Sequence, residues 1–334
     1  MAVALTTLEH RAANDDEPHS GGSFETFSRG GHDGIEGGAA GPKETAGLAI
    51  NEDGSIAVFM GSSAVGQGVE TVFAQIAADA LEIPIERIRD VFHGSTAYVS
   101  DGYGAYHSRS VVMGGSALLD AAKNFQEALR VAAAKRLGCD AAEIDLSDGK
   151  IARRGGPSLS LAEFAGLAVE GAFLNKKHTY SYGAQAAHVA VDVKLGHVEV
   201  IDYVVVQDAG RIINPMTLRG QVIGSLVQGL GGAFLEHLVY DDQGQLLTGS
   251  LADYLLPTAS DFPRLRVILM DEHRSPINPL GAKGAGEGGL IAAGGVIANA
   301  VANALQSFGS DVRELPLTPS RIWELVHAAK KAAE

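Results

Sequence analysis

The chain has 334 residues, 46% of them hydrophobic and 20% charged, with a net charge of −14 at pH 7. This composition is typical of a soluble globular protein with one large or two medium domains, and the negative charge argues against nucleic acid or an anionic membrane as a partner. No apolar run is long enough to span a bilayer, and no secretory signal precedes the first strands, so we expect a cytoplasmic protein without membrane insertion. The single cysteine, Cys139, excludes an intrachain disulfide and an iron–sulfur cluster held by this chain alone.

Residues 1–44 are rich in Gly, Ser, His and acidic side chains and show little periodicity. We expect an irregular N-terminal arm, either packed on a partner chain or partly disordered.

Residues 45–170 form the first predicted subdomain. Its expected elements are a β-hairpin over 48–60, a helix from Val69 that ends before Pro84, a strand over 88–92, a long helix that stops at Gly138, a hairpin over 145–151 and a helix from Ser160.

Residues 171–334 form the second predicted subdomain. Its expected elements are a strand pair over 188–207, a loop over 208–215, a helix over 220–234, a glycine-rich loop over 281–289 with a buried helix behind it, and a last amphipathic helix. Strands and helices are mixed rather than strictly alternating, so the fold class is predicted to be α+β, with two mixed sheet and helix subdomains.

The glycine-rich loop from Gly281 to Gly289 contains one acidic residue, Glu287. Five glycines in nine residues indicate that the backbone approaches something closely. A carboxylate among backbone amides and small residues is a candidate general base, because poor solvation strengthens it as a proton acceptor. The alternative is a tight turn with an exposed glutamate.

Three junctions place glycine-rich backbone at the start of a predicted helix: Gly66–Gly68, Gly114–Gly115 and Gly286–Gly289. Free amides at a helix N-terminus bind anions, so three such junctions favour a large cofactor with phosphate groups. None of them has the spacing of a Walker loop or of the dinucleotide fingerprint, which argues against ATP and NAD.

Five segments together resemble one known family, in the same order along residues 45–325. They are Gly66–Gly68, Ser108–Ser116, Asp208–Pro215, Gly220–Gly229 and the loop with Glu287. The family is the molybdenum hydroxylases, which include xanthine dehydrogenase, aldehyde oxidoreductase and carbon monoxide dehydrogenase, and the resemblance is to the C-terminal part of their large subunit.

The resemblance implies a molybdopterin cofactor, in its cytosine dinucleotide form in bacteria, with molybdenum held by the pterin dithiolene and not by side chains. Glu287 would be the catalytic base that deprotonates a Mo–OH group, while hydride passes from an N-heteroaromatic or aldehyde substrate to a sulfido ligand. The residues that would hold the cofactor are Gly66, Gln67, Gly68, Ser108, Arg109, Ser110, Gly114, Gln221, Gly284 and Gly286.

The chain departs from the family in its length, because the usual large subunit is more than twice as long. The missing half carries a Gly-Gly-Phe-Gly loop and most of the substrate pocket, so the resemblance implies a partner subunit with that half. It also implies partner subunits with 2Fe-2S clusters and FAD. We therefore expect a molybdenum-dependent oxidoreductase that is incomplete alone, as in nicotinate dehydrogenase, where the molybdenum subunit is split.

Several residues have a simpler alternative. Gln67 and Gln221 can bond the nearby backbone, Arg109 can form a structural ion pair, and Ser108 and Ser110 can be turn residues. Lys283 is unassigned, as a solvated charge. Two alternative functions stay open: a carbon monoxide dehydrogenase-type subunit, and a scaffold that binds the cofactor without catalysis.

Overall fold

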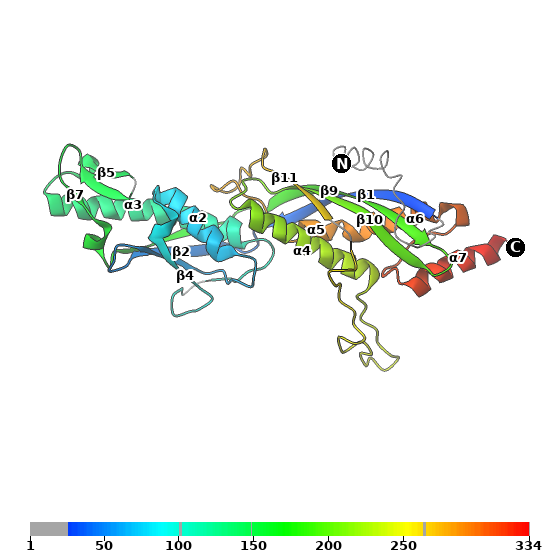
Figure 1. Cartoon of the computed structure of the whole chain (residues 1–334). Helices are drawn as coiled ribbons and strands as arrows, with labels where there is room; N and C mark the ends of the chain where they lie inside the picture. Colours follow the sequence, from blue (N-terminus) through cyan, green and yellow to red (C-terminus); the bar gives the residue numbers. More distant parts are fainter. Residues whose placement is uncertain (1–25, 100–101, 148, 263–264, 334) are drawn as a thin grey trace.

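The computed structural model describes residues 26–99, 102–147, 149–262 and 265–333. The protein is elongated, and two lobes lie end to end along its length (Figure 1). Each lobe has its own cluster of buried hydrophobic side chains. The cofactor-binding residues predicted from the sequence come from both lobes. Whether they form one site therefore depends on where the two lobes contact each other.

The first lobe contains a four-stranded sheet with the order β4-β3-β2-β8 and a small sheet with the order β5-β6-β7. Its strands are β2 (Lys43–Ile50), β3 (Ile56–Met60), β4 (Ile88–His93), β5 (Ile144–Ser147), β6 (Lys150–Arg153), β7 (Ser158–Leu159) and β8 (Ala168–Leu174). Its helices are α2 (Val69–Leu81) and α3 (Gly115–Leu137). Short helical turns are the 3-10 helices η1 (Ile85–Arg87), η3 (Ala141–Glu143) and η4 (Leu161–Phe164) and the π-helix η2 (Ser110–Gly114). Strands β3 and β4 are parallel and are joined by α2, whereas β2 pairs antiparallel with both of its neighbours.

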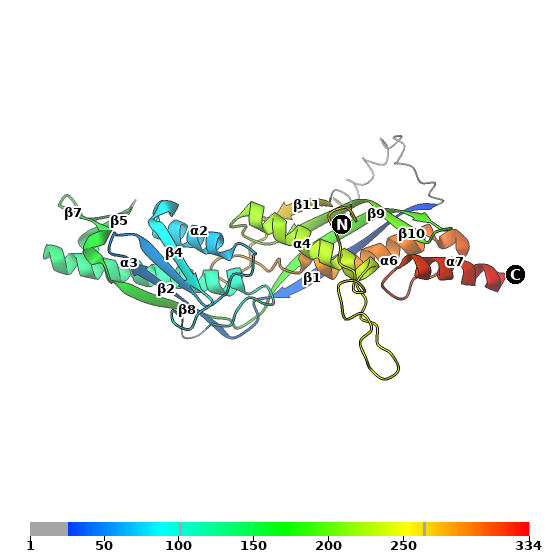
Figure 2. The ribbon, with the colours of Figure 1, turned by 60° about the horizontal axis from the view of Figure 1, so that its bottom comes forward.

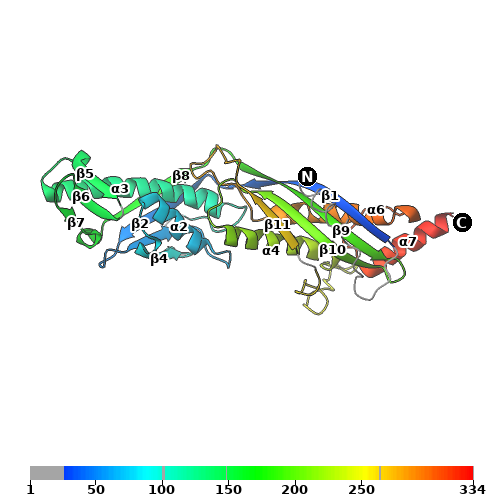
Figure 3. The same cartoon turned by 45° about the horizontal axis from the view of Figure 1, so that its top comes forward.

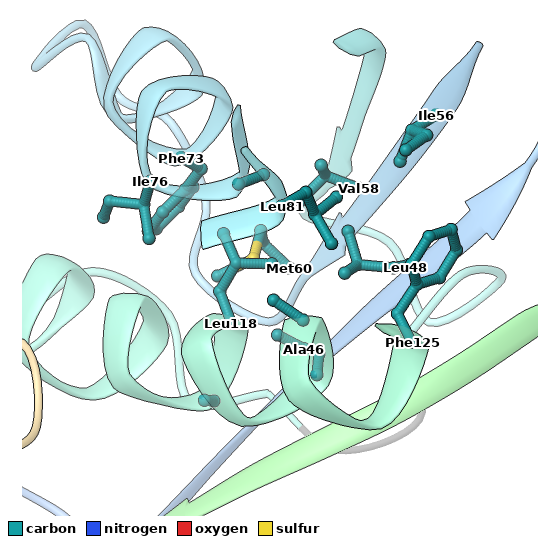
Figure 4. Close-up of a cluster of buried hydrophobic side chains, with 14 of the residues drawn as sticks. Ala46, Leu48, Ile56, Val58, Met60, Phe73, Ile76, Leu81, Leu118 and Phe125 are labelled. Atoms are coloured by element: carbon teal, nitrogen blue, oxygen red, sulfur yellow. The ribbon is translucent and has the colours of Figure 1, made fainter. Parts of the chain in front are cut away.

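Helices α2 and α3 pack on the larger sheet of this lobe and bury its apolar face. Phe73 of α2 and Phe125 of α3 are almost fully buried against Leu48 and Met60 of the sheet (Figure 4). Full burial of one such side chain stabilises the fold by about 1.5–3 kcal/mol. The hairpin and both helices follow the sequence prediction, and α3 ends at Gly138, whose φ of 64° is the left-handed conformation that glycine favours.

The second lobe contains a sheet with the order β1-β9-β10-β11, in which only the β10–β11 pair is parallel. Its strands are β1 (Thr26–Gly38), β9 (Thr179–Asp192), β10 (His197–Asp208) and β11 (Leu265–Met270). Its helices are α4 (Pro215–Phe234), α5 (Gly288–Ile291), α6 (Ala293–Ala304) and α7 (Pro319–Ala333), with the turn η5 (Gln306–Phe308). Helices α4 and α6 cover the same face of the sheet (Figure 3). The predicted α+β class with mixed sheets is confirmed.

Strand β1 corrects the expectation of an irregular arm for residues 26–38. Its backbone pairs with β9 along its whole length, from Thr26 opposite Val191 to Gly38 opposite Thr179. Glycine allows close packing at the end of this strand: a Cβ on Gly38 would lie 3.0 Å from the Thr179 hydroxyl oxygen and 3.3 Å from the Gly284 Cα. The expectation was wrong because small residues removed the alternation by which a strand is recognised. The part of the predicted arm that precedes β1, residues 1–25, lies outside the described residues.

Between α4 and β11, a long excursion over residues 235–262 projects away from the second lobe (Figure 2). It carries only one isolated bridge, Tyr240 to Leu246. Across the described ranges, no helix combines the length and the apolar character that crossing a bilayer requires.

Candidate cofactor site

A cleft of about 360 Å³ lies between the two lobes. The first lobe contributes residues 65–72 and 105–111, and the second contributes residues 209–221 and 282–287. The cleft brings together these residues predicted from sequence: Gln67, Ser108, Arg109, Ser110, Gln221, Gly284, Gly286 and Glu287. Gly66, Gly68 and Gly114 are not among its lining residues.

The first half of the glycine-rich loop is fixed to the segment that follows β10. The Lys283 amide donates to the Ala209 carbonyl at 2.9 Å, and the Arg211 amide donates to the Gly281 carbonyl at 2.9 Å. The Lys283 ammonium pairs with the Asp208 carboxylate at 2.6 Å, with only 9% of the lysine side chain exposed. Lys283 is therefore a partly buried anchor of the loop and not the solvated charge expected from the sequence.

The second half of the loop is hydrogen-bonded to buried polar side chains of β9 and α4. Gln185 of β9 donates to the carbonyls of Gly288 and Gly289 at 2.8 and 3.0 Å, and its own carbonyl accepts from the Tyr203 hydroxyl at 2.7 Å. The Gly289 amide donates to the Ser225 hydroxyl of α4 at 3.1 Å. Burial raises the pKa of Tyr203 far above its ordinary value, so its hydroxyl stays protonated and able to donate.

Close packing explains the glycines at this point. A Cβ on Gly289 would lie 2.4 Å from the Val222 carbonyl, and one on Gly288 would lie 2.1 Å from the Gln207 side chain. At Gly289 the neighbouring atoms include the backbone of α4, so the loop can approach this helix only as glycine, whereas a side chain at position 288 would have to displace the buried Gln207 side chain.

Glu287 lies at the N-terminus of α5, directly before these fixed glycines, and it lines the cleft. Its side chain is exposed in this chain. The expected poor solvation of this carboxylate is therefore not supplied by this chain alone, because burial would need atoms from outside the described residues. The position at the edge of a cleft still suits a proton acceptor, which must reach a reacting group directly.

Ser108 connects the two lobes beside Glu287. It has a φ of 46°, and its hydroxyl donates to the Glu36 carboxylate while accepting from the Gly286 amide at 3.1 Å. Burial raises the pKa of Glu36, although the hydrogen bond from Ser108 lowers it. Ser108 is thus part of a hydrogen-bonded contact between the lobes and more than a simple turn residue.

Arg109 is fully buried, and its guanidinium is used inside the protein. It pairs with Glu44 at 2.6 Å and donates to the carbonyls of Ala40 and Lys43 at 2.8 and 2.9 Å. The rings of Tyr103 and Tyr106 lie 5.0 and 5.6 Å from the guanidinium carbon. This geometry is the structural ion pair that the sequence left open. The backbone of Arg109 is bonded as well, because its amide donates to the Tyr106 carbonyl at 3.2 Å and its carbonyl accepts from the Met113 amide at 2.7 Å.

The loop before α2 is less constrained. Gly66 and Gly68 have φ values of 103° and 77°, and nothing lies within 4 Å of a Cβ built on Gly66. The Gln67 side chain bonds its own loop, accepting from the Val65 amide at 2.6 Å and donating to the Ser63 carbonyl at 3.1 Å. Gln67 therefore bonds the nearby backbone, which was the simpler alternative to cofactor binding, and it also lines the cleft.

The remaining predicted residues separate into two groups. Ser110 and Gln221 line the cleft, and the Gln221 side chain has no hydrogen-bond partner among the described residues, which leaves its carboxamide group available. Gly114 instead packs in the first lobe, where a Cβ would lie 3.0 Å from Met60 and 3.3 Å from Phe73. A packing role accounts for Gly114, and we do not retain it as a cofactor residue.

The sequence did not predict the residues that bond the loop over 281–289 on the side facing the sheet and α4. Gln185, Tyr203 and Ser225 lie in apolar stretches, and Glu36 lies in the segment expected to be irregular. Of these residues, only Gln185 could have been recognised from the sequence, as a polar residue at an apolar position of a strand. It is a buried amide on the face of β9 that carries Ala187 and Val189, and buried polar groups need partners.

The donors of the cleft are suited to a ligand rich in oxygen and nitrogen. Backbone of the segment 284–286, the hydroxyl of Ser110 and the amide of Gln221 all border it. Amides and hydroxyls can bond a pterin or phosphate oxygen without an additional counter-charge. The fold and the cleft thus define one wall of a cofactor-binding protein.

Comparison with known proteins identifies the cofactor. A family model described as the molybdopterin cofactor-binding domain matches residues 7–263, and the chain belongs to this family. Its homologues are molybdenum oxidoreductases.

Two relatives come from Paenarthrobacter nicotinovorans. The gamma subunit of the 6-hydroxypseudooxynicotine dehydrogenase complex is 38% identical over 305 residues, which cover 86% of this chain and 38% of that protein. The large subunit of nicotine 6-hydroxylase is 35% identical over 297 residues, which cover 84% of this chain and 36% of that protein. The chain therefore spans less than two fifths of the length of either relative.

Solved structures show the same fold. Quinoline 2-oxidoreductase from Pseudomonas putida 86 matches 98% of this chain with a TM-score of 0.80 and 30% identity, over 44% of its own length. The Cu,Mo-CO dehydrogenase in its carbon monoxide reduced state matches 98% of this chain with a TM-score of 0.83 and 26% identity, also over 44% of its own length.

Proposed function

We propose that this chain supplies one wall of the active site of a heteromeric molybdenum hydroxylase, with Glu287 as the general base. The observation that carries the proposal is the position of Glu287, at the edge of the cleft between the lobes and on a loop anchored on both sides. A fixed carboxylate beside a cofactor can accept a proton in the same geometry at every turnover.

The molybdenum cofactor would supply an oxygen atom derived from water and would accept two electrons from the substrate. Ser110, Gln221 and the backbone amides of residues 284–285 would hold the pterin and its phosphates, because they border the cleft, whereas the Gly286 amide already donates to Ser108. Gln67 would contribute only if its amide leaves the bonds within its own loop. We further propose the cytosine dinucleotide form of the cofactor.

An N-heteroaromatic compound is the substrate class that we favour, with an aldehyde as the second choice. The names of two similar proteins, nicotine 6-hydroxylase and quinoline 2-oxidoreductase, refer to N-heteroaromatic substrates, and both are at least 30% identical to this chain. A role in carbon monoxide oxidation is the weaker alternative. The solved carbon monoxide enzyme has the higher TM-score but 26% identity, and the large chain of the Hydrogenophaga pseudoflava enzyme is 31% identical, which is below the 35% of nicotine 6-hydroxylase.

Partner subunits complete the proposed enzyme. The relatives are longer than this chain, and the Glu287 side chain is exposed in it, which leaves space for a covering subunit. We propose one partner with the rest of the molybdenum domain, and others with 2Fe-2S clusters and FAD. A scaffold without catalysis is the competing function, and the anchored Glu287 disfavours it.

The test is Glu287→Gln in the purified complex, with Glu324→Gln on the exposed surface of α7 as the matched control. We expect Glu287→Gln to lower kcat by about 100-fold or more, because general base catalysis typically contributes 10²–10⁴-fold. Molybdenum content should stay at the wild-type level. A Glu287→Gln complex that retains near-normal kcat would remove the assigned role.

A further inference from the structure

Glu36 is a buried carboxyl group beside the proposed base, and the function described so far does not use it. It lies on β1 opposite Ser181 of β9, and only 2% of its surface is exposed. Burying a carboxyl group costs free energy unless it is hydrogen-bonded, so its place next to a functional loop calls for a role.

A chain of contacts leads from Glu36 to the base. The Ser108 hydroxyl donates to Glu36 Oε1, and the same hydroxyl accepts from the Gly286 amide at 3.1 Å. Gly286 directly precedes Glu287 in the sequence. The three groups come from β1, from the segment before α3 and from the glycine-rich loop, so they join three distant parts of the chain at one point.

The space around these groups leaves little freedom. A Cβ on Gly284 would lie 2.7 Å from Ser108 Cβ and 2.9 Å from Glu36 Oε1, and one on Gly38 would lie 3.3 Å from Gly284 Cα. Strand β1 and the loop are thus packed backbone to backbone. Ser108 reaches both partners from a left-handed conformation that is uncommon for residues other than glycine, with φ at 46°.

Burial and the nearby charge of Glu287 shift the pKa of Glu36 upward, toward its neutral form. Burial raises the pKa of Glu36 most, the Ser108 hydrogen bond and the backbone of Glu287 and Gly286 lower it, and the charge of Glu287 raises it again. A neutral carboxyl group can accept from and donate to hydroxyl groups without repelling the nearby base.

We propose that Glu36 is a positioning residue, which acts through Ser108 to fix Gly286 and thereby the carboxylate of Glu287. The catalytic consequence rests on the proposed function of Glu287, but the contact itself can be tested separately. A neutral amide at position 36 can replace the carboxyl group in this hydrogen bond, whereas a methyl group cannot.

The experiment compares Glu36→Gln, Glu36→Ala and Ser108→Ala in the assembled complex, with Asp33→Asn, exposed on the same strand, as the control. Amide hydrogen exchange over residues 284–289 reports the contact. Molybdenum content, kcat and KM report its consequence. We expect faster exchange in Glu36→Ala and Ser108→Ala and a kcat lowered about 10- to 100-fold at unchanged KM and molybdenum content, because small displacements of a catalytic group reduce rate strongly.

Glu36→Gln should restore wild-type exchange and a kcat within about threefold of wild type, because its amide preserves the hydrogen bond. Unchanged exchange in both Glu36→Ala and Ser108→Ala would overturn the proposal, and so would a Glu36→Gln variant as impaired as Glu36→Ala. A wild-type complex with no molybdenum would instead refute the proposed function, and the exchange data would still decide whether Glu36 holds the loop.

Discussion

Two glycine-rich loops face the same cleft, and they differ in how firmly the rest of the protein holds them. The loop over 63–68 is stabilised mainly by its own Gln67, and the space beside Gly66 is open. The loop over 281–289 is held by Asp208, Gln185 and Ser225, which come from two strands and a helix. Glycine therefore gives positive φ and freedom in the first loop, and close packing in the second.

The difference shows how one cleft can combine adaptation and precision. An open loop with free backbone can adjust to a large ligand, whereas a loop bonded from several elements keeps its side chain in one position. On this account the loop at 63–68 shapes the cofactor wall and the loop at 281–289 carries the chemistry.

The largest expected effect on stability comes from Arg109, whose segment presents Ser108 to the anchored loop. Arg109→Met leaves Glu44 buried without its partner, and loss of one partner of a buried pair costs roughly 3–5 kcal/mol. Thermal and urea unfolding of the complex will measure it. Arg154→Met, which removes the exposed pair with Asp145, is the control and should leave the melting temperature nearly unchanged.

The comparison between the loops is tested directly by Gly289→Ala and Gly66→Ala. The new Cβ at position 289 would overlap the Val222 carbonyl, so we expect a loss of about 1–3 kcal/mol or more and displacement of Glu287. Position 66 has room for a methyl group, although its φ of 103° is unfavourable for alanine, so a smaller loss of about 1 kcal/mol is expected. Equal effects of the two changes would contradict the distinction.

Tyr203→Phe tests whether the Tyr203 hydroxyl helps Gln185 to hold the loop over 281–289. The change removes the hydroxyl that donates to Gln185 and keeps the packing of the ring, so we expect a loss of about 1–2 kcal/mol. Faster amide exchange at residues 288–289 should accompany it. Tyr240→Phe, an exposed tyrosine of the projecting excursion, is the control. Normal exchange in Tyr203→Phe would show that Gln185 holds the loop without help.

The smallest effect is a pH dependence that comes from Glu36. Its pKa is raised above the ordinary value of 4.5, so its neutral form stabilises the fold fully below pH 4.5, and this stability is lost as pH rises through the pKa of the folded protein. Unfolding measured over a pH series should show Glu36→Gln gaining stability relative to wild type as pH increases. The trend should weaken in a Glu287→Gln background, because the charge of Glu287 raises the pKa of Glu36.

Much of the fold could be predicted from the sequence because its helices carry apolar faces at regular spacing. Phe73, Leu118 and Phe125 mark α2 and α3 in this way, and Glu287 was recognisable from the glycines around it. Strand β1 could not be recognised, since its glycines hide the alternation, and the strands β8 and β11 were also missed.

The residues that hold the glycine-rich loop could not be predicted from the sequence, because they are far from it along the chain. Glu36 and Ser108 meet across 72 positions of the chain, and Asp208 and Lys283 across 75, so only the packing of the lobes reveals these pairs. The sequence left both a cofactor role and an ion pair open for Arg109, because its place beside two serines suggested a phosphate ligand while its partner Glu44 lies 65 positions away in β2.

The central claim is that this chain forms one wall of a molybdopterin site, and elemental analysis of the native complex tests it most directly. Purified with its partner subunits, the protein should contain about one molybdenum per chain and should release CMP on acid hydrolysis of the cofactor. An intact, partner-bound complex without molybdenum would contradict the account, and the non-catalytic scaffold would then become the better description.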